Sequence, residues 1–181
     1  MSTLIRETNE TCVRLSLRLS SDEVDVATGD DFLDHMLVTL SGYGRLGLAV
    51  AATGDLRHHL VEDVAISLGQ ALRRDTPAAC VRYGEATIPM DEALVQAAID
   101  LGGRAFYVGD LDVQLYEHFF YSLAHNAGMT LHLRVLRGRD RHHMVEAAMK
   151  ALGLALRQAL EPSGDLFSTK GAVTLRWEGE N

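Results

Sequence analysis

The chain has 181 residues, a formal charge of −8 and 47% hydrophobic residues. This length suits one compact domain or two small similar halves. The negative charge argues against nucleic acid as the main partner, because phosphate backbones are bound by clustered Lys and Arg. Cys12 and Cys80 form no Cys-x-x-Cys pair, which argues against a zinc ribbon or a redox motif. There is no signal-peptide pattern and no run of 18 apolar residues, so we expect a soluble cytoplasmic protein without a membrane partner.

The sequence of the first half predicts two strands, a helix, a strand and a second helix. TCVRLSLRLS alternates with period two and predicts a strand, and DEVDVAT is expected to return antiparallel to it across a turn at residues 20–22. Asp30 or Asp31 can cap a helix that runs to about Tyr43. A strand over RLGLAVAAT precedes a helix over residues 58–73. The apolar stripe of this second helix contains Val61, Ala65, Leu68 and Leu72.

The second half repeats this pattern. VRYGEATIPM, EALVQAAIDL, RAFYVGDL and TLHLRV read as strands, and residues 115–124 and 142–160 read as helices. The sequence therefore predicts an α+β fold made of two tandem similar halves, about 1–80 and about 81–181. Each half is expected to lay two helices on one face of an antiparallel sheet, and the two halves to pack as one pseudo-symmetric domain over residues 1–181.

A repeated histidine motif supports the two halves. RHHLVED begins at Arg57 and RHHMVEA begins at Arg141. Upstream, at matching distances, stand the acid–histidine pairs Asp34-His35 and Glu117-His118. The unit is acid–His, helix, strand, His-His-x-x-Glu and helix, and it occurs twice.

Helix geometry predicts which of these histidines and glutamates can bind the same metal ion. Positions i and i+4 lie about 40° apart around a helix, so His58 and Glu62 can reach one ion, whereas His59, about 100° away, points elsewhere. The same holds for His142 with Glu146. Six histidines and two glutamates make four ligands for each of two ions and leave open positions for substrate. Imidazole with carboxylate suits Mn, Fe, Zn or Ni, and the oxygen share favours Mn(II).

The alternative is that such a pair is a solvated helix end, which is the usual role of one His-His pair. The duplication, with Glu at the same offset in both copies, favours the metal interpretation. His125 and His132 have no repeat partner, and we take both as structural.

The ordered motifs resemble the imidazoleglycerol-phosphate dehydratase family over nearly the whole chain. They are RETNET, FLDHML, HHLVED, LGQAL, RYGEATIPMDEAL, DLGGR, EHFF, GMTLHL, HHMVEAAMKA and STKG. The resemblance implies a lyase of histidine biosynthesis that removes water from D-erythro-imidazoleglycerol phosphate, giving imidazole-acetol phosphate. It also implies trimers that assemble into a 24-subunit homo-oligomer, with active sites built between subunits.

The resemblance also assigns residues. It implies two Mn(II) per active site, bound by His35, His58, His59, Glu62, His118, His142, His143 and Glu146. It places substrate contacts at Glu10, Arg82, Arg104, Lys150, Ser168, Thr169 and Lys170.

The implied chemistry suits these residue types. No carbonyl activates the carbon that loses its proton, and two Lewis-acid ions can hold the imidazole ring as its anion and so help to expel the hydroxyl. Glu10 is the candidate acid/base, and His35, Glu62 and Glu146 complete the predicted catalytic set. The cations and hydroxyls of the substrate set suit a phosphate. Asp91 and Glu92 fit either a catalytic pair or a solvated turn.

The chain departs from the family pattern in three places. The approach to the first metal helix is the short GDLRHH, Tyr43 stands where the family usually has His, and the short EPSGDLF precedes STKG. Two other functions stay open: a dimetal phosphoester hydrolase, which would use the same ligands, and a metal-stabilised assembly protein without turnover, which the shortened loop motivates.

Overall fold

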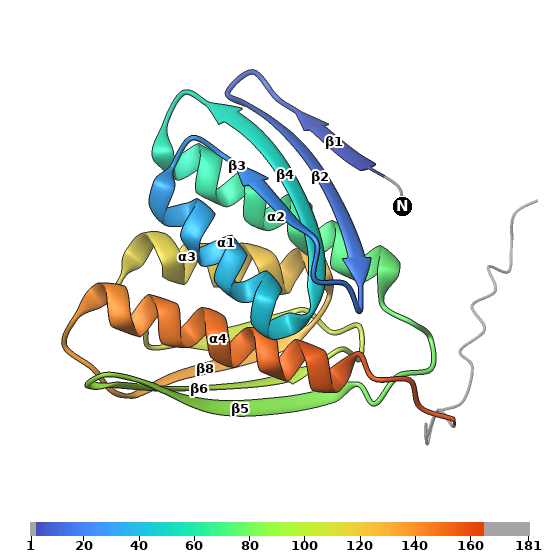
Figure 1. Ribbon diagram of the computed structural model, residues 1–181, viewed down its shortest axis with the longest axis vertical. Coiled ribbons are helices and arrows are strands. Elements are labelled where there is room, and N and C mark those ends of the chain that lie inside the picture. The colour runs from blue at the N-terminus through green and yellow to red at the C-terminus, as the bar shows by residue number, and fades with distance from the viewer. Residues whose placement is uncertain (1–2, 165–181) are drawn as a thin grey trace, which may run out of the picture.

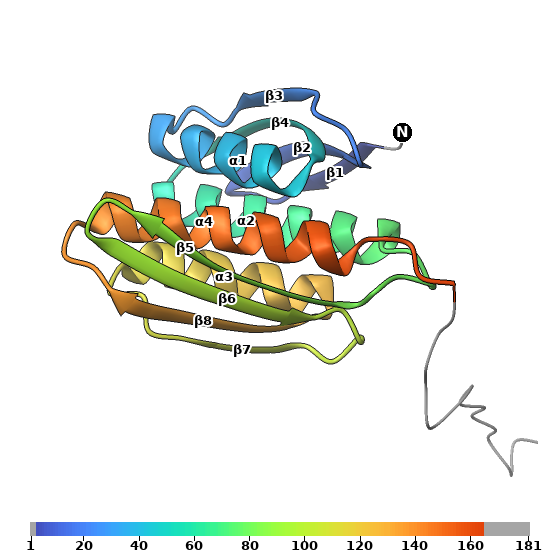
Figure 2. The same cartoon turned by 60° about the horizontal axis from the view of Figure 1, so that its bottom comes forward.

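The computed structural model describes residues 3–164, which form four layers, with a sheet on each outside and helices between them (Figures 1 and 2). The first half contains β1 (Thr3–Glu7), β2 (Thr11–Leu19), β3 (Val24–Ala27), α1 (Asp31–Gly44), β4 (Leu46–Gly54) and α2 (Arg57–Asp75). The second contains β5 (Tyr83–Met90), β6 (Ala93–Asp100), β7 (Phe106–Gly109), α3 (Gln114–Ala127), β8 (Thr130–Arg137) and α4 (Arg141–Ala159). The predicted α+β architecture of tandem halves is confirmed. No helix within 3–164 is long and apolar enough to span a membrane.

The two sheets have the same topology, and one predicted pairing is wrong. Their strand orders are β1-β2-β4-β3 and β5-β6-β8-β7. The expected hairpin between β2 and β3 does not form: β3 lies parallel to β4, with Val24 opposite Leu48. β2 pairs instead with β4 and with β1, a strand at the opposite edge of the sheet that we did not predict from the sequence. Because α1 connects β3 to β4, the two strands can run parallel, and each sheet is antiparallel with one parallel edge.

Two of the four helices, α1 and α4, begin at an aspartate that caps the first turn. The Asp30 side chain accepts a hydrogen bond from the Leu33 N–H and caps α1, and Asp140 caps α4 in the same way. The predicted apolar stripe of α2 is fully buried against the first sheet and α3. Each helix buries one face in a continuous hydrophobic core, and this burial sets which residues lie on its other faces.

Two glycines bring the halves together. Gly69 of α2 and Gly153 of α4 occupy the same position in the repeat. A Cβ on Gly69 would lie 2.7 Å from the backbone oxygen of Leu123 in α3, and one on Gly153 would lie 2.9 Å from that of Leu40 in α1. Any larger residue would push the helices apart. The close crossings of α2 with α3 and of α4 with α1 set histidines of one half beside those of the other.

Candidate metal centre

The first cluster joins α1 to α4, and we call it the α4 triad: His35, His142 and Glu146. Glu146 is buried, and its Oε2 lies 3.1 Å from Nε2 of His142 and 3.5 Å from Nε2 of His35. Burial raises the pKa of the Glu146 carboxyl, but hydrogen bonding to Lys150 and the charge of Lys150 outweigh it and hold that pKa below its usual value. The carboxylate is therefore ionised and faces two imidazole nitrogens.

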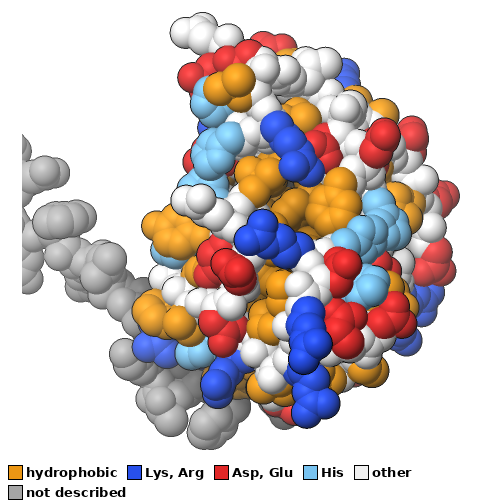
Figure 3. All heavy atoms as spheres, turned by 90° about the vertical axis from the view of Figure 1, so that its left-hand side faces the viewer, with side chains coloured by type: hydrophobic (Ala, Val, Ile, Leu, Met, Phe, Trp, Pro, Cys, Tyr) orange, Lys and Arg blue, Asp and Glu red, His pale blue; other side chains and the backbone are white. Residues whose placement is uncertain are grey.

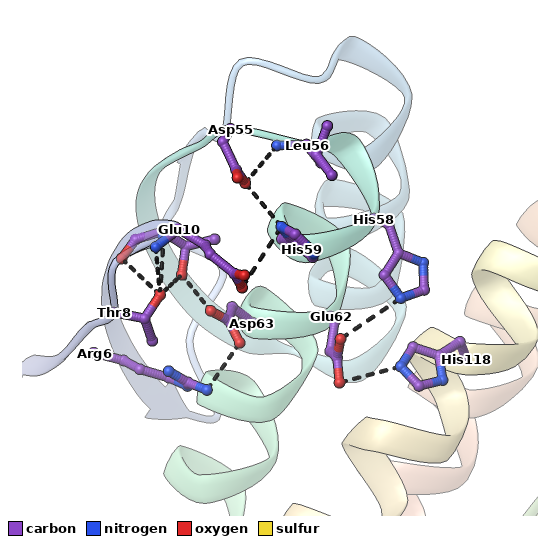
Figure 4. Close-up of polar contacts among 11 residues, drawn as sticks. Arg6, Thr8, Glu10, Asp55, Leu56, His58, His59, Glu62, Asp63 and His118 are labelled. Carbon is purple, nitrogen blue, oxygen red and sulfur yellow. Dashed lines mark hydrogen bonds and ion pairs between the residues drawn. The ribbon is translucent and has the colours of Figure 1, made fainter.

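The second cluster joins α2 to α3, and we call it the α2 triad: His58, Glu62 and His118. Figure 4 shows Glu62 between the two imidazoles, with Oε2 3.7 Å from Nε2 of His58 and Oε1 3.2 Å from Nε2 of His118. The two rings are stacked, with centroids 5.1 Å apart.

The donor sets fit a divalent metal. Within each triad one ligand atom of every residue lies within 4.8 Å of the others. In the α2 triad, Nε2 of His118 is buried and makes no hydrogen bond to any residue between 3 and 164, although it faces Glu62. A buried polar atom without a hydrogen bond is costly. Coordination of an ion would satisfy it, and imidazole with carboxylate is a donor set for Mn, Fe, Zn or Ni.

Each triad crosses between the halves. The α4 triad takes two residues from the second half and His35 from the first, and the α2 triad takes two from the first and His118 from the second. Figure 3 shows the end of the molecule at which α1, α2 and α4 begin, where histidine side chains gather in two groups with acidic side chains beside them. The structure thus brings together six of the eight predicted ligands; that they bind metal stays a prediction.

The other two predicted ligands, His59 and His143, lie outside the triads, as the 100° offset along the helix requires. Nδ1 of His59 lies 2.8 Å from Asp55 and 3.6 Å from Glu10 (Figure 4). Nδ1 of His143 lies 2.7 Å from Glu92. A carboxylate that accepts from Nδ1 holds the neutral ring in the tautomer whose lone pair is on Nε2, the form that binds metal.

These pairs shift the pKa values of their members. Donating a hydrogen bond to Asp55 raises the pKa of His59, and donating one to Glu92 raises the pKa of His143. The carboxyl of Glu92 accepts the backbone N–H of Asp140 and the His143 ring N–H, which lowers its pKa to about 2. Glu92 therefore anchors the ring of His143.

Comparison with known proteins identifies the family. The family model described as imidazoleglycerol-phosphate dehydratase matches residues 28–156. The chain is 45% identical to the imidazoleglycerol-phosphate dehydratase of Bacillus cereus strain AH820, over 95% of this chain and 98% of that one. It is also 45% identical to that of Streptococcus thermophilus, over 93% and 96%. The chain belongs to the imidazoleglycerol-phosphate dehydratase family.

Two solved structures of this dehydratase family share the fold. The IGPD of Pyrococcus furiosus, crystallised in complex with (S)-C348, has a TM-score of 0.87 and 38% identity, covering 94% of this chain and 100% of that one. The enzyme of Staphylococcus aureus subsp. aureus N315 has a TM-score of 0.78 and 32% identity, with 90% and 100% covered. The two halves with mixed sheets are thus the fold of this dehydratase family.

Sequence reasoning missed the anchoring roles of several acidic residues that hold the site in place. Asp34 accepts the Thr28 N–H at 2.9 Å, and Glu117 accepts the Leu111 N–H at 3.2 Å, so the acids before His35 and His118 anchor the starts of their helices. Asp55 stands four residues before His59, a spacing that could have indicated the pair. No local pattern could have indicated that Glu92 pairs with His143, 51 residues away.

The predicted substrate residues of this dehydratase family member separate into two groups. Glu10 lies beside His59, and Lys150 lies beside the α4 triad. Arg82 does not: its backbone N–H donates to Ala159 at the far end of α4, about 25 Å from His142 at 1.5 Å per residue. There its side chain forms two hydrogen bonds to Asp100, of 2.6 and 3.0 Å, which lower the pKa of that carboxyl.

Arg104 is exposed and lies on the same side of the molecule as Arg82. Its carbonyl accepts the hydroxyl of Thr130, which is opposite Asp100 in the sheet. A single chain therefore does not bring these two cations to the triads. Ser168, Thr169 and Lys170 lie outside the described residues.

Proposed function

We propose that this chain is a hydro-lyase that removes water from D-erythro-imidazoleglycerol phosphate to give imidazole-acetol phosphate in histidine biosynthesis. The observation that carries the proposal is family membership over most of the chain, combined with the two triads that the family fold assembles from both halves. The shortened GDLRHH approach and Tyr43 leave both triads intact.

The proposed cofactor is two Mn(II) per active site, held by the two triads together with His59 and His143. The ions supply Lewis acidity that stabilises the anion of the substrate's imidazole ring. The chain's own part is to orient the donors. Glu62 and Glu146 each present a carboxylate between two imidazoles, and carboxylates fix the rings of His59 and His143.

The proposed acid/base is Glu10, at the loop between β1 and β2. Its carboxylate is more than half exposed and lies 3.6 Å from His59, so it is open to solvent beside the metal ligands. A carboxylate there can move a proton to or from a substrate bound at the triads. His35, Glu62 and Glu146 complete the proposed catalytic set through their hold on the metal.

Phosphate recognition leads to a proposal about assembly. Lys150 is the one predicted substrate-binding cation within 3–164 that lies near a triad, whereas Arg82 and Arg104, the cations predicted to bind the phosphate, lie at the opposite end of α4. We infer that a second copy of the chain supplies these arginines, so that Arg82 and Arg104 of one copy lie beside the triads of another. This fits the trimers and the 24-subunit assembly that the resemblance implies, with residues 1–181 as one domain and the cytoplasm as the proposed location. Ser168, Thr169 and Lys170 complete the proposed substrate set.

The test is direct. The protein is loaded with Mn(II) and supplied with imidazoleglycerol phosphate, and two products are measured: the enolisable ketone and inorganic phosphate. The proposal expects ketone without phosphate. Phosphate release instead would indicate a dimetal hydrolase, and neither product would indicate an assembly protein without turnover.

A matched pair of variants controls the experiment. His35→Ala removes a triad ligand and is expected to abolish ketone formation. His132→Ala removes an exposed histidine of β8 that lies outside both triads, and it should leave the rate within about twofold of the parent.

A further inference from the structure

The two triads differ by one positive charge. When the repeats are aligned at His58 and His142, Lys150 of α4 falls on Ile66 of α2. Both stand one turn beyond the glutamate of their triad, at i+4, where helical side chains meet. The chain therefore builds two otherwise similar donor sets and places an ammonium group beside only one of them.

Lys150 occupies one oxygen of the α4 triad. Its Nζ lies 2.9 Å from Oε1 of Glu146, and the two imidazoles face the other oxygen, Oε2. Only 14% of the Lys150 side chain and 10% of the Glu146 side chain are exposed, so solvent screens the pair weakly. The ammonium also lies 3.2 Å from Sδ of Met90 and over the ring of Tyr43, 5.7 Å from its centroid. These contacts hold it in place.

The α2 triad has no such cation. Both oxygens of Glu62 face imidazoles, one toward His58 and the other toward His118. Among residues 3–164 no Lys or Arg is paired with Glu62. The neighbouring Asp63 is neutralised by Arg6 at 2.9 Å, so that pair adds little net charge.

We propose that the two metal sites are unequal, and that the α2 triad binds a divalent cation first and more tightly because Lys150 holds the carboxylate of the α4 triad. This rests on the proposed function only in that both triads bind metal. An ion at the α4 triad must either share Glu146 with the ammonium, at close range and low screening, or displace it from its packed position. Repulsion between the ammonium and a divalent ion should raise the Kd of the α4 triad for that ion by at least about tenfold.

The experiment measures each site alone. Full-length protein is stripped with chelator, and Mn(II) is titrated while free Mn(II) is followed by electron paramagnetic resonance. His118→Ala removes a ligand of the α2 triad and isolates the α4 triad, and His35→Ala does the reverse. The expected result is a Kd at least about tenfold lower in His35→Ala than in His118→Ala. Equal values in the two variants would overturn the inference.

A charge swap then tests the cause. Lys150→Met, added to His118→Ala, should tighten the remaining site about tenfold. Ile66→Lys, added to His35→Ala, should weaken the other site by a similar factor, with circular dichroism as the check on folding. An unchanged Kd on Lys150→Met would overturn the role of the ammonium. Failure of the parent protein to bind Mn(II) at all would overturn the proposed function as well, whereas two equal sites would overturn this inference alone.

Discussion

Asp63→Ala should destabilise the protein and also free the β1–β2 loop from α2 at the candidate site. Asp63 follows Glu62 on α2, and its side chain is 10% exposed. It pairs with Arg6 of β1 at 2.9 Å and accepts a hydrogen bond from the Thr11 hydroxyl of β2. The β1–β2 loop carries Glu10, so these contacts tie the proposed acid/base to the helix that carries the metal ligands.

The magnitude follows from burial. Removing one partner of a buried ion pair costs about 3–5 kcal/mol, because the other charge stays desolvated. The Arg6 side chain is 27% exposed, so water restores part of its solvation, and we expect a loss of about 2–3 kcal/mol. For a chain of this length, that lowers Tm by roughly 4–12 °C.

The assay is thermal unfolding followed by circular dichroism, with metal-free protein at one fixed concentration. The control is Asp22→Ala, which breaks a pair of 3.4 Å to Arg45 in which Asp22 is 73% exposed. This control should cost less than about 0.5 kcal/mol. The reasoning is refuted if Asp63→Ala is no more destabilising than Asp22→Ala.

Three further predictions concern the helix crossing, an acid anchor and the metal. Gly69→Ala should cost about 1–3 kcal/mol in urea unfolding because its Cβ would meet Leu123, whereas Gly42→Ala, where no atom lies within 4 Å, should be neutral or stabilising; similar effects would contradict the close crossing. The pKa of Glu92 falls from 4.5 to about 2 on folding, so its contribution to stability is present above pH 4.5 and is lost as the pH falls toward 2. Glu92→Gln should therefore flatten the acid side of a stability-against-pH curve, and parallel curves would argue against the anchor role. Mn(II) at about 100 times Kd should stabilise the metal-free protein by about 2.7 kcal/mol, reversibly with chelator, and an unchanged Tm would count against binding to the folded state.

Much of the fold could be predicted because its signals are local. The stripe from Val61 to Leu72, the cap at Asp30 and the alternation in β2 each depend on neighbours within one element. The pairing of β3 could not be predicted in this way. A short turn at residues 20–22 suits a hairpin locally, but the crossover through α1 places β3 parallel to β4 at the sheet edge.

In the candidate site, too, the local spacing could be predicted and the long-range contacts could not. The i, i+4 spacing of His58 and Glu62 predicts that they face one point, and the repeat predicts the same for His142 and Glu146. Which histidine of the other half completes each triad depends on the helix crossings. The i, i+4 spacing of Glu146 and Lys150 could have predicted their contact, but the family resemblance gave Lys150 only as a substrate contact.

The central claim is that ions are held between the two halves by both triads. Crystals of the Mn(II)-loaded protein, measured at the manganese absorption edge, test it through the anomalous difference map. The claim predicts two peaks per chain, one touching His35 and Glu146 and the other touching His118 and Glu62. A map whose peaks touch donors of one half only, or that leaves His35 and His118 without an ion, would contradict it.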